Sequence, residues 1–181
     1  FRIVSDLKPS VFIMENVPGI LSIHDGGIKN YILEIFDRIG YNTACDVLLA
    51  AEYGVPQLRK RAFFIGNNLG YNSNDLFPEK THGPELQDFI TIEDAIFDLP
   101  FIESGEGEFE SDYDKDPISN YQIKMRGNTP KLFNHIAPVH DVRTLEIIKK
   151  IKEGEGMKSL PLKYQTKSVH SGAYGRMLRN K

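Results

Sequence analysis

Two short apolar runs, each carrying ionisable residues at one end, constrain this chain most. The run Val11–Met14 is followed directly by Glu15, and the run Ala62–Ile65 is preceded by Arg61. A short segment that is apolar on both faces is typical of a buried strand in a parallel sheet. If the two strands are neighbours, a carboxylate and a guanidinium meet at one edge of the sheet. That arrangement suits a planar heterocycle held by its polar rim.

Hydrophobic spacing predicts the elements around these strands. Apolar residues from Ile28 to Ile39 recur at helical spacing, with Asp25 as the expected N-cap and Gly40 as the expected C-cap. The segments Tyr41–Leu49 and Lys60–Gly66 have the composition of strands. Strand, helix, strand and a nearby strand in that order form the back half of a doubly wound α/β sheet. We therefore predict an α/β domain over residues 1–66.

The composition changes after Gly66, where a smaller and more irregular domain is predicted over residues 67–181. A short helix is expected at Thr91–Leu99, opened by Thr91 with an acidic residue at the capping-box spacing. A second helix is expected at Val142–Glu153. Leu145, Ile148 and Ile151 are predicted to share one face of it, with Lys149, Lys150 and Lys152 toward another. The segment Glu103–Asp116 holds seven acidic residues and one lysine, which predicts a solvated, mobile loop away from any phosphate.

The two motifs together resemble the bacterial cytosine-C5 DNA methyltransferases. Glu15-Asn16-Val17 is similar to the Glu-Asn-Val element of that family, and Gln57–Arg61 is similar to its Gln-x-Arg-x-Arg element, with Glu15 and Arg61 46 residues apart. The resemblance implies a Rossmann-like methyltransferase sheet whose last two strands are antiparallel. Residues 1–66 would be the C-terminal half of that catalytic domain, and residues 67–181 an incomplete target-recognition domain.

The family match also implies roles for individual residues. Methylation of cytosine at C5 begins with addition of a thiolate at C6, which is easier when N3 of the ring is protonated or hydrogen-bonded. By the match, Glu15 serves N3 and accepts from the exocyclic amine, while Arg61 reaches the carbonyl O2. These two are the predicted catalytic residues. The predicted DNA contacts are Asn16, which also ties the loop after its strand, Gln57, Arg59, Lys60 and, with the basic residues from Lys124 onward, Arg126.

Structural alternatives to these roles remain open at this point. Glu15 could cap the following turn or form a surface ion pair, and Arg59 and Arg61 could protect an edge strand from aggregation. Cys45, the one cysteine, lies in an expected apolar strand after Glu15 and has no neighbouring proline. We interpret it as a small core residue and not as the family's nucleophile.

The family's Pro-Cys nucleophile loop and its glycine-rich S-adenosylmethionine loop are absent from the 14 residues before Glu15. His170–Met177 is similar to the lead-in of the family's next element. We therefore expect an internal fragment that by itself neither transfers a methyl group nor binds S-adenosylmethionine, the cofactor of the complete enzyme. Three alternatives stay open: one subunit of a split enzyme, a non-catalytic DNA-binding module, and a domain whose acidic half binds protein.

Charge and composition bound the partners. The net charge of −3 divides into −12 over residues 1–116 and +9 over residues 117–181, which indicates one face for a polyanion such as nucleic acid. The family resemblance implies that this partner is double-stranded DNA. A single cysteine fits a reducing bacterial cytoplasm, and no Cys/His spacing predicts a structural metal. No apolar run approaches the roughly 20 residues of a membrane span. A sheet without its first strands would bare apolar surface, which predicts self-association.

Overall fold

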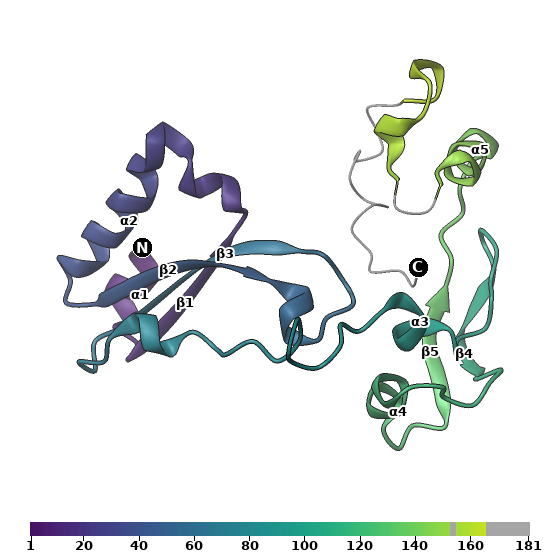
Figure 1. Cartoon of the computed structure of the whole chain (residues 1–181), viewed down its shortest axis with the longest axis horizontal. Helices are drawn as coiled ribbons and strands as arrows, with labels where there is room; N and C mark the ends of the chain where they lie inside the picture. Colours follow the sequence, from purple (N-terminus) through teal and green to yellow (C-terminus); the bar gives the residue numbers. More distant parts are fainter. Residues whose placement is uncertain (153–154, 166–181) are drawn as a thin grey trace. The chain divides into compact units, whose positions relative to one another are not determined.

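The computed structural model describes residues 1–152 and 155–165, which form two compact units (Figure 1). The first unit comprises Phe1–Val55 and Arg59–Asp88, and the second comprises Pro56–Leu58 and the described residues from Phe89 onward. Both contain helices and strands, so the predicted α/β class is confirmed. No helix among the described residues is both long and apolar enough to cross a bilayer.

A three-stranded sheet organises the first unit. Its strands are β1 (Val11–Asn16), β2 (Asn42–Leu49) and β3 (Lys60–Asn67), in the spatial order β1-β3-β2. The predicted strands are therefore present, and β3 is antiparallel to both of its neighbours. The expectation of a strand buried on both faces is wrong for β1. Phe12 is buried, whereas Ile13 on the opposite face is 67% exposed.

One face of this sheet carries the core of the first unit. The helix α2 (Gly27–Asp37) packs there through Phe36, whose ring centroid lies 4.2 Å from that of Phe12. Tyr41 completes the buried cluster and donates its hydroxyl to Pro9 O at 2.5 Å. A short helix, α1 (Arg2–Leu7), adds apolar contacts at the same face. Gly66 leaves room for the Phe12 ring, since a Cβ there would lie 2.2 Å from Cε1 of that ring.

The predicted caps of α2 are wrong in detail. The N-cap is Gly26, and Asp25 has a φ of 52° within the 3-10 helix η2 (Ile23–Gly26). An N-cap side chain reaches the first free N–H groups only from extended backbone, so Asp25 is not placed to cap. The C-cap is Arg38, and Gly40 follows two residues later with a φ of 87°, where the chain reverses.

The first compact unit includes the residues that follow β3, up to Asp88. The buried amide of Asn67 accepts from Leu69 N and Tyr71 N, which holds the turn after β3. Ser73, in η4 (Ser73–Leu76), donates its hydroxyl to Asn42 O at 2.7 Å. These bonds tie residues 67–76 to the end of β2, because the polar turn finds its partners there.

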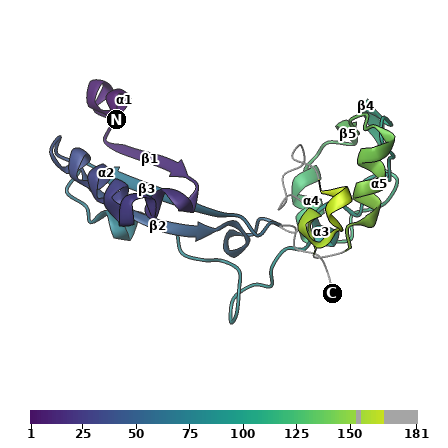
Figure 2. The same ribbon diagram turned by 90° about the horizontal axis from the view of Figure 1, so that it is seen from above.

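The second unit is built from short helices and a two-stranded sheet, seen from another side in Figure 2. Its elements are α3 (Ile92–Ile96), β4 (Gly107–Asp112), α4 (Asn120–Arg126), β5 (Lys131–Ile136), α5 (Val142–Lys150), η5 (Met157–Ser159) and η6 (Leu162–Tyr164). The two strands are antiparallel. The expected helix that begins at Val142 is confirmed but ends at Lys150, and its buried residue is Ile147 at 3% exposure.

The expectation of a mobile loop over Glu103–Asp116 is wrong for its central part. Residues Gly107–Asp112 form β4, whose backbone pairs with β5. Lys131 of β5 also binds Asp112 at 2.6 Å, which offsets part of the acidic charge. Composition alone favoured a mobile loop, but backbone bonds to a partner strand order this stretch, while its side chains stay mostly exposed.

The capping box at the start of α3 is present as predicted. Thr91 Oγ1 accepts from Asp94 N at 3.1 Å, and Asp94 Oδ2 accepts from Thr91 N at 2.9 Å. Thr91→Ala is expected to lower the free energy of unfolding of the second unit by about 1 kcal/mol, because Asp94 N loses its acceptor and Asp94 Oδ2 loses the hydroxyl that donates to it. Thr91→Ser, which keeps the hydroxyl, serves as the control in denaturant titrations followed by circular dichroism. Equal destabilisation by both variants would contradict this role.

Candidate active site

Glu15 and Arg61 meet on the sheet face opposite α2. Glu15 lies across from Phe63, and Arg61 is two residues from Phe63 on β3, so the two side chains are diagonal neighbours on one face. Arg61 Nε lies 2.7 Å from Glu15 Oε1, with the arginine side chain 18% exposed and the glutamate side chain 45% exposed. Arg61 Nη1 also donates to Lys60 O at 2.8 Å, which fixes the plane of the guanidinium.

These two side chains line a pocket of about 300 Å³ in the first unit. Its wall is mostly apolar, and its polar groups are one carboxylate and two guanidiniums. The lining residues are Glu15, Leu48, Ala50, Tyr53, Arg59, Arg61 and Phe63. Binding sites for small ligands commonly combine an apolar wall with a few polar groups. This volume lies at the small end of such sites, as a single heterocycle requires.

The apolar wall was not predicted from the sequence. Leu48 lies directly opposite Arg61 on β2, so the pairing register alone brings it to the pocket. Tyr53 is the last residue of η3 (Ala50–Tyr53), the 3-10 helix that directly follows β2. The sequence signal for both was their place in the stretch Val47–Gln57, to which no individual role had been assigned.

A strap from residues 78–82 holds η3 in place. Thr81 N and His82 N both donate to Glu52 O, and Lys80 Nζ lies 2.7 Å from the Glu52 carboxylate. That hydrogen bond raises the pKa of Lys80 above its ordinary value. Tyr53 donates to Pro78 O at 3.3 Å, and burial, followed by the charge of Glu52, raises the pKa of its phenol. Tyr53 therefore presents a neutral ring to the pocket.

The other residues predicted for the site lie in different places. Arg59 lines the pocket with Arg61, as their alternate spacing indicated. Lys60 points to the other side of β3, since successive strand residues alternate. Asn16 also lies on the other face from Glu15, and its Oδ1 accepts from Val17 N at 2.8 Å. Gln57 groups with the second unit, so it is not among the pocket residues.

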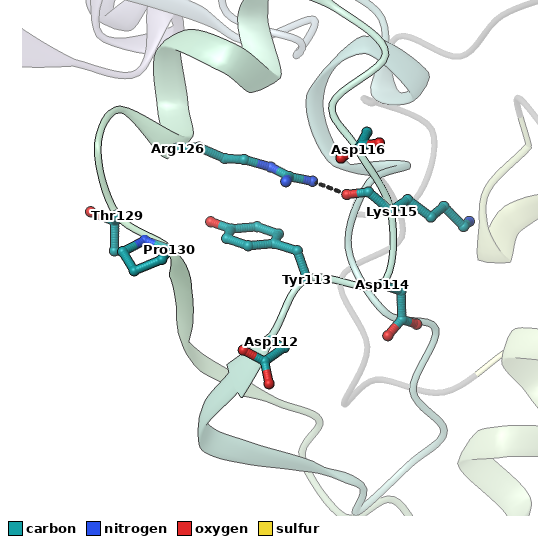
Figure 3. A pocket seen from close by; sticks show the side chains of 8 residues that line it. All are labelled: Asp112, Tyr113, Asp114, Lys115, Asp116, Arg126, Thr129 and Pro130. Carbon is teal, nitrogen blue, oxygen red and sulfur yellow. Dashed lines mark hydrogen bonds between the residues drawn. The ribbon is translucent and has the colours of Figure 1, made fainter.

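Arg126 is engaged inside the second unit. Its Nε lies 2.7 Å from Asp98 Oδ2, where the aspartate side chain is 3% exposed, and its Nη2 donates to Lys115 O at 2.6 Å. Figure 3 shows the guanidinium stacked on the ring of Tyr113, 3.7 Å from the ring centroid. The adjoining cavity of about 310 Å³ is rimmed by Asp112, Asp114 and Asp116. These partners make Arg126 an anchor of the fold, and we do not propose it as a DNA contact.

Cys45 lies on β2, with its register partner Phe64 fully buried. Burial is the largest effect on this thiol and raises its pKa above the ordinary value, so little thiolate forms near neutrality. Cys45 is therefore expected to react with Ellman's reagent at pH 7.5 at least tenfold more slowly than free glutathione, and at the free-thiol rate after denaturation. Fast reaction of the folded chain would contradict the interpretation of Cys45 as a core residue.

The electrostatics of the pocket limit what it can hold. Two guanidiniums face one carboxylate, so the pocket favours an uncharged or electron-rich ring with acceptor atoms. S-adenosylmethionine carries a positive sulfonium, which Arg59 and Arg61 would repel, so this pocket does not fit the cofactor. Across residues 1–152 and 155–165, no group of three or more His, Cys, Asp or Glu side chains is placed to hold a metal ion.

Comparison with known proteins agrees with this geometry. The model of the C-5 cytosine-specific DNA methylase family matches residues 1–176. The Type II methyltransferase M.DdeI of Desulfomicrobium norvegicum is 37% identical over 160 residues, covering 87% of this chain and 39% of that protein. M1.HphI of Haemophilus parahaemolyticus is 32% identical, covering 88% and 36%. A crystal structure of a DNA modification methyltransferase from an Escherichia coli prophage aligns with a TM-score of 0.62 and 25% identity, over 87% of this chain and 50% of the other.

The chain therefore belongs to the C-5 cytosine-specific DNA methylase family. It spans between 36% and 39% of the length of these two curated relatives. His170–Met177, which resembles the lead-in to a further family element, lies outside the described residues.

Proposed function

We propose that this chain supplies the base-binding edge of a DNA (cytosine-5-)-methyltransferase. In this proposal Glu15 and Arg61 contact the polar rim of a cytosine swung out of duplex DNA, while Arg59 adds positive charge at the pocket mouth. The observation that carries the proposal is the 2.7 Å contact between Glu15 and Arg61 at the wall of one pocket. A carboxyl and a guanidinium held this close can serve adjacent donor and acceptor atoms of one pyrimidine.

The pair is better explained by chemistry than by stability. A partly exposed ion pair contributes only about 0.2–1 kcal/mol to folding. Glu15 also makes no cap for the following turn: the N-cap of η1 (Pro18–Leu21) is Val17, and no side chain caps it. The edge-protection alternative fits β3 poorly, because β3 lies between β1 and β2.

The proposed step moves a proton or a hydrogen bond at a defined atom. As the family's thiolate adds to C6, electron density builds at N3 and O2 of the ring. The carboxyl of Glu15 serves N3 and accepts from the exocyclic amine, and the guanidinium of Arg61 donates to O2. S-adenosylmethionine supplies the methyl group in the complete enzyme. Its site and the thiolate are proposed to lie outside the pocket described here.

The second unit, most of which follows Asp88 in the sequence, is proposed to recognise duplex DNA, while the first unit binds the extruded base. Extruding a base costs a few kcal/mol, so phosphate contacts elsewhere must hold the distorted backbone. Lys60 is proposed to contribute one such contact, because its side chain is exposed and has no salt-bridge partner among residues 1–152 and 155–165.

A graft tests this function. The chain replaces the 160-residue segment that it matches in M.DdeI, and transfer of labelled methyl groups from S-adenosylmethionine to phage DNA is measured. We expect methylated DNA with 5-methylcytosine as the product. A graft that folds and binds duplex DNA but transfers nothing would favour the non-catalytic DNA-binding module. Activity restored only when the chain is added to separate flanking polypeptides would favour the split enzyme.

The outer edge of β1 predicts self-association of the isolated chain. Among the described residues β1 is paired on one side only, and Val11 and Ile13 are exposed beside that edge. An unpaired strand edge with apolar side chains is a template for further pairing. Sedimentation velocity is expected to show a concentration-dependent dimer or larger species, and Ile13→Lys is expected to shift it toward monomer. A monomer at every concentration would contradict this prediction.

A further inference from the structure

The last described part of the chain forms a small module around α5. Ile147 of α5 packs with Met157 and Leu160, which are 3%, 2% and 8% exposed. Ile151 and Tyr164 border this cluster. Figure 1 shows the segment that follows α5 folded back beside it. Apolar packing therefore holds η5 and η6 against α5 and fixes the positions of the polar residues between them.

Five exposed lysines decorate this module. We call them the α5–η6 lysine patch: Lys149, Lys150, Lys152, Lys158 and Lys163. Glu155 is the one acidic residue between Lys149 and Lys163 that the structure describes, and Glu153 lies outside the described residues. The patch therefore carries a clear excess of positive charge.

Three other cations of the second unit are engaged by internal partners. Arg126 binds Asp98, and Lys131 binds Asp112. Lys115 Nζ donates to Phe97 O at 3.4 Å. In contrast, none of the patch lysines forms a salt bridge within residues 1–152 and 155–165. Lys124 and Arg143 are likewise exposed and form no salt bridge among the described residues, but the five patch lysines are the largest such group in the second unit.

Tyr164 preorganises two of these lysines. Lys150 Nζ lies 5.1 Å and Lys163 Nζ lies 5.0 Å from the centroid of the Tyr164 ring. Both ammonium groups are attracted to the ring face, which lowers the entropy that they lose on binding. Since both lie about 5 Å from one centroid, they are at most about 10 Å apart, a span of about three phosphates along one strand.

We propose that the α5–η6 lysine patch is the surface through which the second unit holds the phosphate backbone of duplex DNA. The proposal rests on the proposed function, which makes duplex DNA the partner. Lysine is a compact point charge that binds phosphates, and phosphate contacts carry no sequence information. Binding through the patch is therefore expected to be independent of sequence.

The test uses the 181-residue chain and a fluorescent duplex of arbitrary sequence, with affinity measured by anisotropy between about 50 and 200 mM salt. The variant Lys150→Gln/Lys158→Gln/Lys163→Gln is compared with Lys8→Gln/Lys29→Gln/Arg38→Gln, which removes the same charge from the first unit. The patch variant is expected to bind at least tenfold more weakly at about 100 mM salt, with the slope of log K against log salt reduced by about 2–3. The control variant is expected to stay within about twofold of the wild type.

A second pair of variants tests whether the aromatic face of Tyr164, and not only its apolar packing, contributes to DNA binding. Tyr164→Phe is expected to bind like the wild type, because the ring face remains. Tyr164→Leu keeps an apolar side chain but releases both lysines, and it is expected to bind about two- to fivefold more weakly. If both variants behave alike, the ring does not organise the patch.

Other outcomes overturn the proposal. Equal losses in the patch variant and the control would show that net charge alone governs binding. Binding of the chain to phosphatidylserine vesicles but not to the duplex would assign the patch to a membrane surface instead. A patch variant with wild-type affinity, together with a graft that transfers methyl groups, would overturn the patch and leave the proposed function standing. Loss of duplex binding in the patch variant, together with an inactive graft, would instead support the patch and overturn the proposed function.

Discussion

Glu15→Gln in the M.DdeI graft is expected to lower methyl transfer to DNA by about 100-fold or more, the scale of a lost general acid. The amide keeps the size of the side chain but cannot pass a proton to N3 of the ring. The free energy of unfolding is expected to change by less than about 1 kcal/mol, because the pair with Arg61 is partly exposed. Single-turnover methyl transfer, with denaturant titration of the same preparation, measures both quantities.

Two further variants test whether the loss of activity is specific to the Glu15–Arg61 pair. Asp46→Asn removes a carboxylate from the same sheet face, since Asp46 also lies opposite Phe63, but it does not line the pocket. Asp46→Asn is expected to keep activity within about threefold of the unaltered graft. Arg61→Lys keeps the charge but loses the planar fork, and it is expected to lower activity by at least tenfold. Activity that is unchanged in Glu15→Gln would remove Glu15 from the chemistry.

Phe36→Ala is expected to lower the free energy of unfolding of the first unit by about 3–5 kcal/mol. Phe36 is 2% exposed, and its ring packs against those of Phe12 and Tyr41. Removing the ring leaves a cavity between α2 and the sheet that the rigid strands cannot close. Much of the stability of a small domain would be lost, so the first unit is expected to be largely unfolded at 37 °C.

Tyr31→Ala on the same helix is the matched control. Tyr31 is an aromatic residue of α2 with 58% exposure, so its loss is expected to cost less than about 1 kcal/mol. Urea titration followed by circular dichroism compares the two variants. Similar midpoints for Phe36→Ala and Tyr31→Ala would contradict the position of the core between α2 and β1.

The strands and α2 could be predicted because each is encoded in local sequence. Apolar periodicity marked Lys60–Gly66 and the helix around Phe36, and the spacing of Thr91 and Asp94 marked a capping box that is present. The failures have non-local causes. β4 is a strand because β5 pairs with it, which the acidic composition of β4 gives no means to infer. The left-handed backbone at Asp25, within η2, is not revealed by the spacing of apolar residues that marked α2.

The candidate site was predictable in its charged residues but not in its walls. Alternation along one strand was enough to put Arg59 and Arg61 on one face, and both line the pocket. Contact between Glu15 and Arg61 depends on the register of β1 against β3, which a single sequence does not reveal. Tyr53 and Leu48 complete the pocket through that register and through the strap on Glu52. The internal contacts of Arg126 could not be predicted, because its partners, Asp98 and Tyr113, are distant in sequence.

The proposed contact between Glu15 and the extruded cytosine is tested most directly by a double-mutant cycle, in which binding affinity is measured with Glu15 and the base altered singly and together. Methylated sites are first mapped, and the graft and its Glu15→Ala variant are then titrated with duplexes carrying cytosine or 2-pyrimidinone, which lacks the exocyclic amine, at the target. Removal of the amine is expected to weaken binding about tenfold or more in the graft, because a hydrogen bond to a charged group is lost. It is expected to have hardly any effect in Glu15→Ala, because that variant has already lost the carboxylate that accepts from the amine. Equal losses in both proteins, with a coupling energy below about 0.5 kcal/mol, would show that Glu15 does not contact the base.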